Sequence, residues 1–356
     1  MELLRRLQHA LKRRDALIAI LRGKIINFLL KNRVMDGTEI QYLKEGNFKT
    51  GLVKRSSVSF GINVNFYSDV KKFSHTFSPR DTIILKDAVL NSRTGTIWAE
   101  SRSTKTISLI SESTEWPNQN VLVKHAMPKL NKIKVIDRGK IGLSNEGFFH
   151  WLQEDFPKIG DLNNDRKFLQ FEKMNKLNKE VLEYFKSPYE LVPEWVRVKE
   201  LEFESRGKDV GYLHPFQLER LKEISNKIIE EDVHSPNKIY VSRLNQRRSA
   251  INEKNLIDLL SNFGFYIFDA NKLGFFDQIK LFANPKIVLG IHGAGLSHAL
   301  WNNKTCLVEL MPQERINRCF EWQSLLNANK YLRIDFSNGT LDIENIQKIL
   351  GANDFL

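Results

Sequence analysis

The sequence predicts an α/β protein whose C-terminal third is a doubly wound parallel sheet. From residue 236 to residue 336, apolar runs such as "KIYV", "KIVLGI" and "TCLVELM" alternate with amphipathic helical patterns. Strands that are apolar throughout are buried on both faces, which is typical of a parallel sheet covered by helices. Of the 356 residues, 42% are hydrophobic and 27% are charged, as in a soluble globular protein of two or three domains.

The first predicted element is a basic amphipathic helix over residues 1–35. Its apolar residues recur at helical spacing and form one face, made of Leu4, Leu7, Leu11, Ile18, Leu21, Ile25 and Leu29. Residues 1–33 also hold nine Lys or Arg against two acidic residues, which is most of the formal net charge of +12. The pattern suits a helix lying in the surface of an anionic membrane, and equally a helix packed on protein. Both interpretations stay open.

A second domain is predicted over residues 36–231. Its first part, residues 38–136, contains short β-rich runs such as "SVSFGINVNF" and "DTIILKDAVL". Its second part is helical, with patterns such as "FFHWLQEDFPKI" and "FEKMNKLNKEVLEYF". The loop "DVHSPN" marks the boundary, and residues 232–356 form the doubly wound domain with a terminal helix.

Composition disfavours several classes of protein. The positive charge is concentrated in one segment and no nucleic-acid motif is present, so no nucleic-acid partner is expected. The sequence contains no run of eighteen apolar residues, so no membrane span is predicted. The first residues lack the pattern of a secretory signal. Only Cys306 and Cys319 are cysteines, which fits a reducing compartment. We therefore expect a cytoplasmic location.

The segment "GIHGAGLSHAL" is a predicted anion-binding corner between a buried strand and a short helix. Ligands of open parallel sheets bind at the carboxyl ends of strands, and a helix N-terminus favours a phosphate. The glycines Gly293 and Gly295 let the backbone approach a ligand closely. A dinucleotide fingerprint needs a further glycine where His298 stands, and the Gly-Lys-Ser/Thr of a P-loop is absent. A pyrophosphate is the expected ligand. The alternative is that the segment is a tight turn in which His292 has no functional role.

Two more strand ends carry polar side chains. After the strand "KIYV" come three arginines, Arg243, Arg247 and Arg248, and then Asn252 as the expected N-cap of a helix. Arginines in this place can clamp phosphate oxygens, although loop arginines are also often only solvated. Glu309, in "CLVELMP", can accept hydrogen bonds from ribose hydroxyls or serve as a capping acid.

Together these segments resemble the family 61 glycosyltransferases of bacterial type. The resemblance covers about residues 138–336 and is carried by "IYVSRLNQRRSAINEKNLIDLLSNFGF", "FDQIKLFANPKIVLGIHGAGLSHALW" and "CLVELMP". Upstream, "GFFHWLQEDFPKI" is similar to the histidine-plus-acid segment of that family. The resemblance implies a GT-B fold, in which two Rossmann-like domains face a cleft. It also implies inverting sugar transfer from a nucleotide sugar, typically a UDP-sugar.

The resemblance assigns roles to the residues at the strand ends. Arg243 and Arg247 would bind the donor diphosphate, supported by Arg248 and Asn252. The diphosphate cradle would consist of His292, Gly293, Ala294 and Gly295. Glu309 would face the ribose or the base.

Inverting transfer also needs a base for the acceptor hydroxyl, expected from the opposite domain. The histidine-plus-acid segment supplies His150 and Glu154, which share one face of a helix at i and i+4. Glu154 is the expected base, His150 its orienting or relaying partner, and Asp155 the reserve. The alternative is that the surrounding aromatic residues form a core around incidental polar groups.

No cofactor and no metal are expected, because the histidines are scattered and no Asp-x-Asp occurs. The expected partners are a nucleotide sugar and a glycan or lipid-linked glycan acceptor, as in capsule, lipopolysaccharide or exopolysaccharide synthesis. Through residues 1–33 the protein would lie peripherally at the inner face of the plasma membrane. A non-catalytic nucleotide- or carbohydrate-binding protein on the same fold is the alternative function.

Overall fold

The computed structural model describes most of the chain beyond residue 80 and short segments before it. The described residues are 33–35, 52–59, 62–67, 72–77, 80–100, 107–111, 133–144, 147–160, 166–204, 213–229, 234–244, 246 and 249–355. The predicted basic helix, Arg247 and Arg248 lie outside them. No helix in these ranges is both long enough and apolar enough to cross a membrane.

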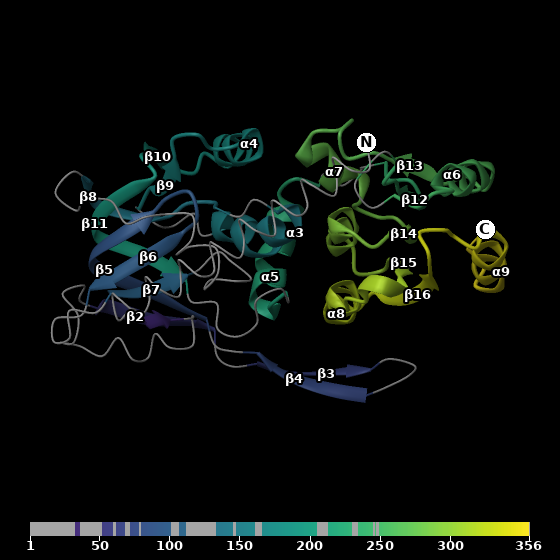
Figure 1. Ribbon diagram of the computed structural model, residues 1–356, viewed down its shortest axis with the longest axis horizontal. Coiled ribbons are helices and arrows are strands. Elements are labelled where there is room, and N and C mark those ends of the chain that lie inside the picture. Colours follow the sequence, from purple (N-terminus) through teal and green to yellow (C-terminus); the bar gives the residue numbers. More distant parts are fainter. Residues whose placement is uncertain are drawn as a thin grey trace, which may run out of the picture. The chain divides into compact units, whose positions relative to one another are not determined.

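The chain divides into two compact units. Figure 1 shows their helices and strands, with colours that follow the sequence. The N-terminal unit contains residues 1–62, 76–145 and 162–210, and the C-terminal unit contains residues 63–75, 146–161 and 211–356. This division differs from the predicted boundary at residue 231. The segment 146–161 and the residues after 210 group with the C-terminal sheet.

The N-terminal unit contains a mixed sheet. Along the described chain its strands are β1 (Arg33–Met35), β2 (Leu52–Ser59), β5 (Arg80–Asn91), β6 (Thr96–Glu100), β7 (Ile107–Ser111), β8 (Lys134–Ile141), β9 (Phe168–Phe171), β10 (Tyr189–Val192) and β11 (Trp195–Glu204). Their order is β1-β7-β6-β5-β11-β8-β9-β10, and β2 also pairs with β5. The helix α4 (Lys176–Tyr184) lies between β9 and β10 in sequence. A separate pair is formed by β3 (Ile62–Tyr67) and β4 (Lys72–Phe77), most of whose residues group with the C-terminal unit.

The core of this sheet follows the alternation of its strands. In the antiparallel pairing of β11 with β5, the buried Leu201 lies opposite Leu85 and the buried Val198 opposite Ala88. On its other edge β11 pairs in parallel with β8, and β9 pairs in parallel with both β8 and β10. The sheet thus joins a mostly antiparallel half, in which β1 and β7 pair in parallel, to a parallel half. Only the parallel half resembles part of the predicted Rossmann-like domain.

The C-terminal unit contains the predicted doubly wound parallel sheet. Its strands are β12 (Lys238–Val241), β13 (Tyr266–Phe268), β14 (Ile287–Ile291), β15 (Cys306–Pro312) and β16 (Lys330–Phe336). All neighbours pair in parallel in the order β13-β12-β14-β15-β16. The chain direction across the sheet reverses between β12 and β14, which makes their carboxyl ends the topological switch point.

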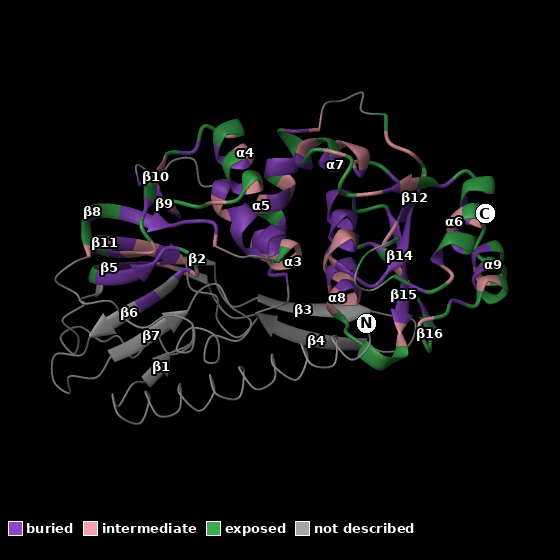
Figure 2. Ribbon diagram, turned by 45° about the horizontal axis from the view of Figure 1, so that its top comes forward, coloured by how far each residue is buried: buried purple, intermediate pink, exposed green. Residues whose placement is uncertain are grey.

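Helices cover both faces of this sheet, as Figure 1 shows. On one face lie α6 (Glu253–Asn262) and α9 (Ile343–Ala352). On the other lie α7 (Phe275–Leu281), the 3-10 helix η5 (Ala294–Trp301) and α8 (Cys319–Leu326). The central strands between them are buried along their length, coloured purple in Figure 2. Burial on both faces explains why these strands are apolar runs rather than alternating patterns.

A further layer packs on η5 in the same unit. Its elements are α3 (Phe148–His150), the π-helical turn η3 (Trp151–Asp155), the 3-10 turn η4 (Phe156–Gly160) and α5 (Pro215–Asn226). The cause is an aromatic cluster in which Phe148, Trp151 and Phe156 meet Phe275 with ring centroids 6.1, 5.1 and 5.1 Å apart. Phe148 also lies 5.2 Å from the His298 ring. These contacts, each favourable beyond simple burial, attach the segment to the C-terminal unit.

Candidate functional site

The corner after β14 brings Arg243 and His292 together at the switch point. Arg243 follows β12, and its Nη1 donates a hydrogen bond of 2.6 Å to the carbonyl oxygen of His292. At Gly293 the backbone is extended, with φ 169° and ψ 165°, so its conformation does not require glycine. A Cβ at Gly293 would instead overlap with the guanidinium group, lying 2.8 Å from Arg243 Cζ. Glycine is present because the arginine needs that space.

Gly295 serves a different close approach. A Cβ there would lie 2.8 Å from Cγ1 of Val241 on the neighbouring strand β12. The glycine therefore lets η5 pack tightly against the sheet, whereas the sequence pattern predicted that it faces a ligand. Ala294 and Gly295 remain partly exposed at the start of η5, where a helix N-terminus presents N–H groups to an anion.

The turn that carries Arg243 is held by Glu253, the first residue of α6. Its Oε1 accepts hydrogen bonds from Arg243 N at 2.6 Å, Tyr240 Oη at 3.1 Å and Ser242 Oγ at 3.3 Å. Glu253 is fully buried. Burial, followed by the nearby Glu253 carboxylate, raises the pKa of Tyr240 well above its usual value. Glu253 thus fixes the backbone from which the Arg243 side chain extends.

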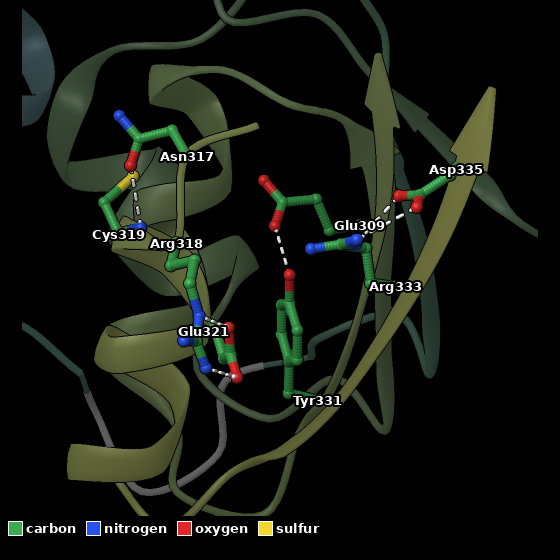
Figure 3. Close-up of polar contacts among 8 residues, drawn as sticks. All are labelled: Glu309, Asn317, Arg318, Cys319, Glu321, Tyr331, Arg333 and Asp335. Carbon is green, nitrogen blue, oxygen red and sulfur yellow. Dashed lines mark hydrogen bonds and ion pairs between the residues drawn. The ribbon is translucent and has the colours of Figure 1, made fainter. Parts of the chain in front are cut away.

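Glu309 contacts His292 in this structure. Its Oε1 lies 2.6 Å from His292 Nδ1, and its Oε2 accepts a hydrogen bond of 2.6 Å from the hydroxyl of Tyr331 (Figure 3). Glu309 is fully buried on β15 and His292 is nearly so. This geometry favours a role for Glu309 in holding His292, and contact with a ribose stays a prediction. Tyr331 was not expected from the sequence, because only the strand register brings it beneath Glu309.

Asn252 has the predicted position before α6 but makes no side-chain cap bond there. Its Nδ2 donates to the carbonyl of Leu341 at 2.8 Å, and its Oδ1 accepts from Leu341 N at 2.9 Å. The amide therefore ties the start of α6 to the segment that precedes α9. The structure gives Asn252 a structural partner, and its predicted support of the donor stays untested.

The predicted base lies in a π-helical turn. His150 Nδ1 and Glu154 Oε1 are 3.6 Å apart, so the expected i, i+4 pair is in contact. Glu154 keeps slight exposure at 7%, whereas Asp155 has none and pairs with Lys158 at 2.8 Å. Turns of this wider kind occur frequently at functional sites. The geometry favours Glu154 over Asp155 as the group that can reach a substrate.

Two residues of α8, Phe320 and Gln323, connect α3 and this turn to the corner within the C-terminal unit. The Phe320 ring lies 5.4 Å from the Phe149 ring and 5.4 Å from the His292 ring. Gln153 Nε2 donates to Gln323 Oε1 at 3.1 Å. Gln323 Nε2 in turn donates to the carbonyl of Ser297 in η5 at 3.3 Å. The structure therefore brings the two predicted groups of residues close together in one unit, whereas the base was expected from the opposite domain.

His298 is part of the core and not of the site. It is fully buried, and desolvation lowers its pKa from 6.5 to about 3. Trp301 Nε1 donates a hydrogen bond of 3.0 Å to its Nδ1, and Phe282 stacks on its ring.

Within the described ranges no group of three or more His, Cys, Asp or Glu side chains could hold a metal ion. Comparison with known proteins gives one family match: residues 148–309 match the model of the Glycosyltransferase 61 family. No curated protein sequence matches the chain. The matched range begins at the start of α3 and ends at Glu309, so it contains both the π-helical turn and the corner.

Proposed function

We propose that the protein is an inverting glycosyltransferase that uses a UDP-sugar, because residues 148–309 match the model of the Glycosyltransferase 61 family. A glycosyltransferase domain implies a sugar donor and a glycan acceptor. The observation that carries the proposal for the donor is the contact of Arg243 with the His292 corner at the switch point of the sheet. This is where open α/β sheets bind their ligands, and an arginine there can meet a diphosphate.

On the donor side, the diphosphate would lie at the start of η5. The N–H groups of that helix end and the Arg243 guanidinium would stabilise the charge that develops on the leaving diphosphate. Arg247 and Arg248 follow Arg243 in the sequence and are proposed to assist. Cations and a helix end supply this stabilisation without a metal ion, so activity in the presence of a chelator is part of the proposal.

On the acceptor side, Glu154 would act as general base. It takes the proton of the acceptor hydroxyl while that oxygen bonds to the anomeric carbon and the bond to the diphosphate oxygen breaks. Attack from the face opposite the leaving group inverts the configuration. His150, 3.6 Å from the carboxylate, would orient it or pass the proton on.

A thermal-shift screen against UDP-, GDP-, CMP- and TDP-sugars tests the donor proposal. A ligand at a hundred times its dissociation constant stabilises the folded state by about 2.7 kcal/mol, or roughly 5–10 °C in unfolding temperature for a domain of this kind. The proposal expects the largest shift with a UDP-sugar, followed by slow hydrolysis of that donor. No shift with any of the four classes would contradict it.

We also propose that the acceptor is a glycan or lipid-linked glycan, such as a capsule, lipopolysaccharide or exopolysaccharide precursor, at the cytoplasmic membrane surface. The basic pattern of residues 1–33 supports this location. Flotation with anionic liposomes should require residues 1–33. Equal flotation of a chain lacking them would contradict the membrane role of that segment.

A further inference from the structure

Three side chains at neighbouring strands form a hydrogen-bonded row in the C-terminal unit, in which Glu309 and His292 are buried and Tyr331 is half-buried. Tyr331 on β16 donates to Glu309 on β15, and Glu309 meets His292 directly after β14. In the parallel register Leu307 lies beside Tyr331 and Glu309 beside Arg333. Tyr331, Glu309 and His292 therefore share one sheet face and step diagonally toward the carboxyl ends of the strands.

The protonation of this row follows from its surroundings. Burial raises the pKa of Tyr331 far above its usual value, and the Glu309 carboxylate raises it further, so the phenol keeps its proton and donates. An ionised carboxylate has only acceptors to offer. With Glu309 in its carboxylate form, Oε1 is the acceptor in the 2.6 Å contact with His292, and this arrangement has the proton on Nδ1. The other ring nitrogen, Nε2, is then the one available to a ligand.

The charged residues around Tyr331 are committed to other partners, as Figure 3 shows. Arg333 makes a bidentate pair with Asp335, at 2.8 and 2.9 Å. Arg318, directly before α8, makes a bidentate pair with Glu321, at 2.6 and 2.7 Å. Both arginines thus point to their own acids, and the hydroxyl of Tyr331 is the group aimed at Oε2 of Glu309.

We propose that Tyr331 is a positioning residue for His292: through Glu309 it fixes the proton on Nδ1 and turns Nε2 toward the donor diphosphate. The part of this inference that concerns the diphosphate rests on the proposed function. The part that concerns the histidine does not, because the hydrogen bonds exist in the protein alone. In this proposal Glu309 acts on the donor indirectly, by holding the His292 ring.

The variant Tyr331→Phe removes the hydroxyl and keeps the ring. Glu309 is then left with an unpaired buried oxygen, and a carboxyl that gained a proton would donate to Nδ1 and reverse the tautomer. A hydrogen bond to a charged group contributes enough that its loss weakens UDP binding by about tenfold. The donor KM should rise by a similar factor, while kcat at saturating donor changes little.

Nitrogen-15 spectra of the histidine rings, with His292 assigned from the His292→Gln variant, read the tautomer without any ligand. The expected result is a protonated Nδ1 in the wild type and a mixed or reversed tautomer in Tyr331→Phe. Tyr266→Phe is the matched control, because Tyr266 is partly exposed on β13 at the other edge of the sheet. It should change neither the spectrum nor the affinity for UDP.

Two results would overturn the inference. A wild-type protein with the proton on Nε2 of His292 contradicts it even if Tyr331→Phe does not fold. A folded Tyr331→Phe protein with an unchanged spectrum and unchanged UDP affinity also contradicts it. If the wild type binds no UDP at all, the proposed donor fails, and the ligand-free spectra still decide whether Tyr331 positions His292.

Discussion

Gly293 shows how one residue can be fixed by a neighbouring side chain. Its backbone is extended and open to any residue, but its missing Cβ leaves room for the Arg243 guanidinium. The backbone of Arg243 is held in turn by Glu253, whose carboxylate accepts a hydrogen bond from Arg243 N. The corner is thus built from both sides of the switch point, and a Cβ at Gly293 would displace the guanidinium.

Gly293→Ala should therefore displace Arg243 and weaken UDP binding by about tenfold, the loss of one charge-assisted contact. Calorimetric titration with UDP measures the change. Gly147→Ala is the control, because a Cβ there has its nearest neighbour at 3.9 Å. Equal UDP affinity of Gly293→Ala and Gly147→Ala would show that UDP binding does not require the Arg243 guanidinium in the position beside Gly293.

Glu154→Gln should reduce transfer by at least about a hundredfold, since general-base catalysis typically contributes that much or more. UDP affinity should stay within about twofold, because the carboxylate acts on the acceptor. Steady-state transfer and calorimetry give the two values. Glu223→Gln, on the exposed side of α5, is the matched control. Near-normal turnover of Glu154→Gln would refute its role as base.

At the scale of elements, Asn252 joins α6 to the segment before α9. Asn252→Ala removes both hydrogen bonds to Leu341 and should lower the free energy of unfolding by about 1–3 kcal/mol, as measured in urea. UDP affinity should be unchanged. Asn255→Ala, on the exposed face of α6, should have little effect on stability. A loss of UDP binding in Asn252→Ala without destabilisation would restore the donor role expected from the sequence.

The sheet of the C-terminal unit could be predicted from the sequence because its strands are long apolar runs between amphipathic helices. The grouping of residues 146–161 with that sheet could not. It depends on ring contacts of Trp151 and Phe156 with Phe275, which no local pattern reveals. The π-helical turn could not be predicted either, because its sequence has ordinary helical periodicity.

The site was predictable to the same extent. His292 and Arg243 stand out because they follow apolar strands directly, and strand ends of a parallel sheet meet at one edge. Tyr331 does not stand out, because its role depends on the register of β16 against β15. Glu253 resembles a common first-turn acid, and only the three hydrogen bonds to its Oε1 show what it holds.

At the scale of the whole molecule, the buried His298 makes stability depend on pH. The pKa of His298 is about 3 in the folded protein and near 6.5 when exposed. Between these values the unfolded chain binds a proton that the folded chain does not, so stability falls as pH is lowered from 6.5 toward 3. The contribution is at most about 1.4 kcal/mol per pH unit.

His298→Gln tests this, because its amide oxygen can still accept from Trp301 and does not titrate. Unfolding in urea at several pH values should show a shallower acid decline for the variant than for the wild type. Parallel declines would mean that His298 does not contribute to the acid sensitivity.

The central claim is that the corner formed by Arg243, His292 and Gly293 binds the diphosphate of a nucleotide-sugar donor. Calorimetric titration of UDP into the wild type and into His292→Ala tests it most directly. The account predicts measurable binding to the wild type and affinity weaker by about tenfold or more in the variant. The same dissociation constant for both proteins would contradict it.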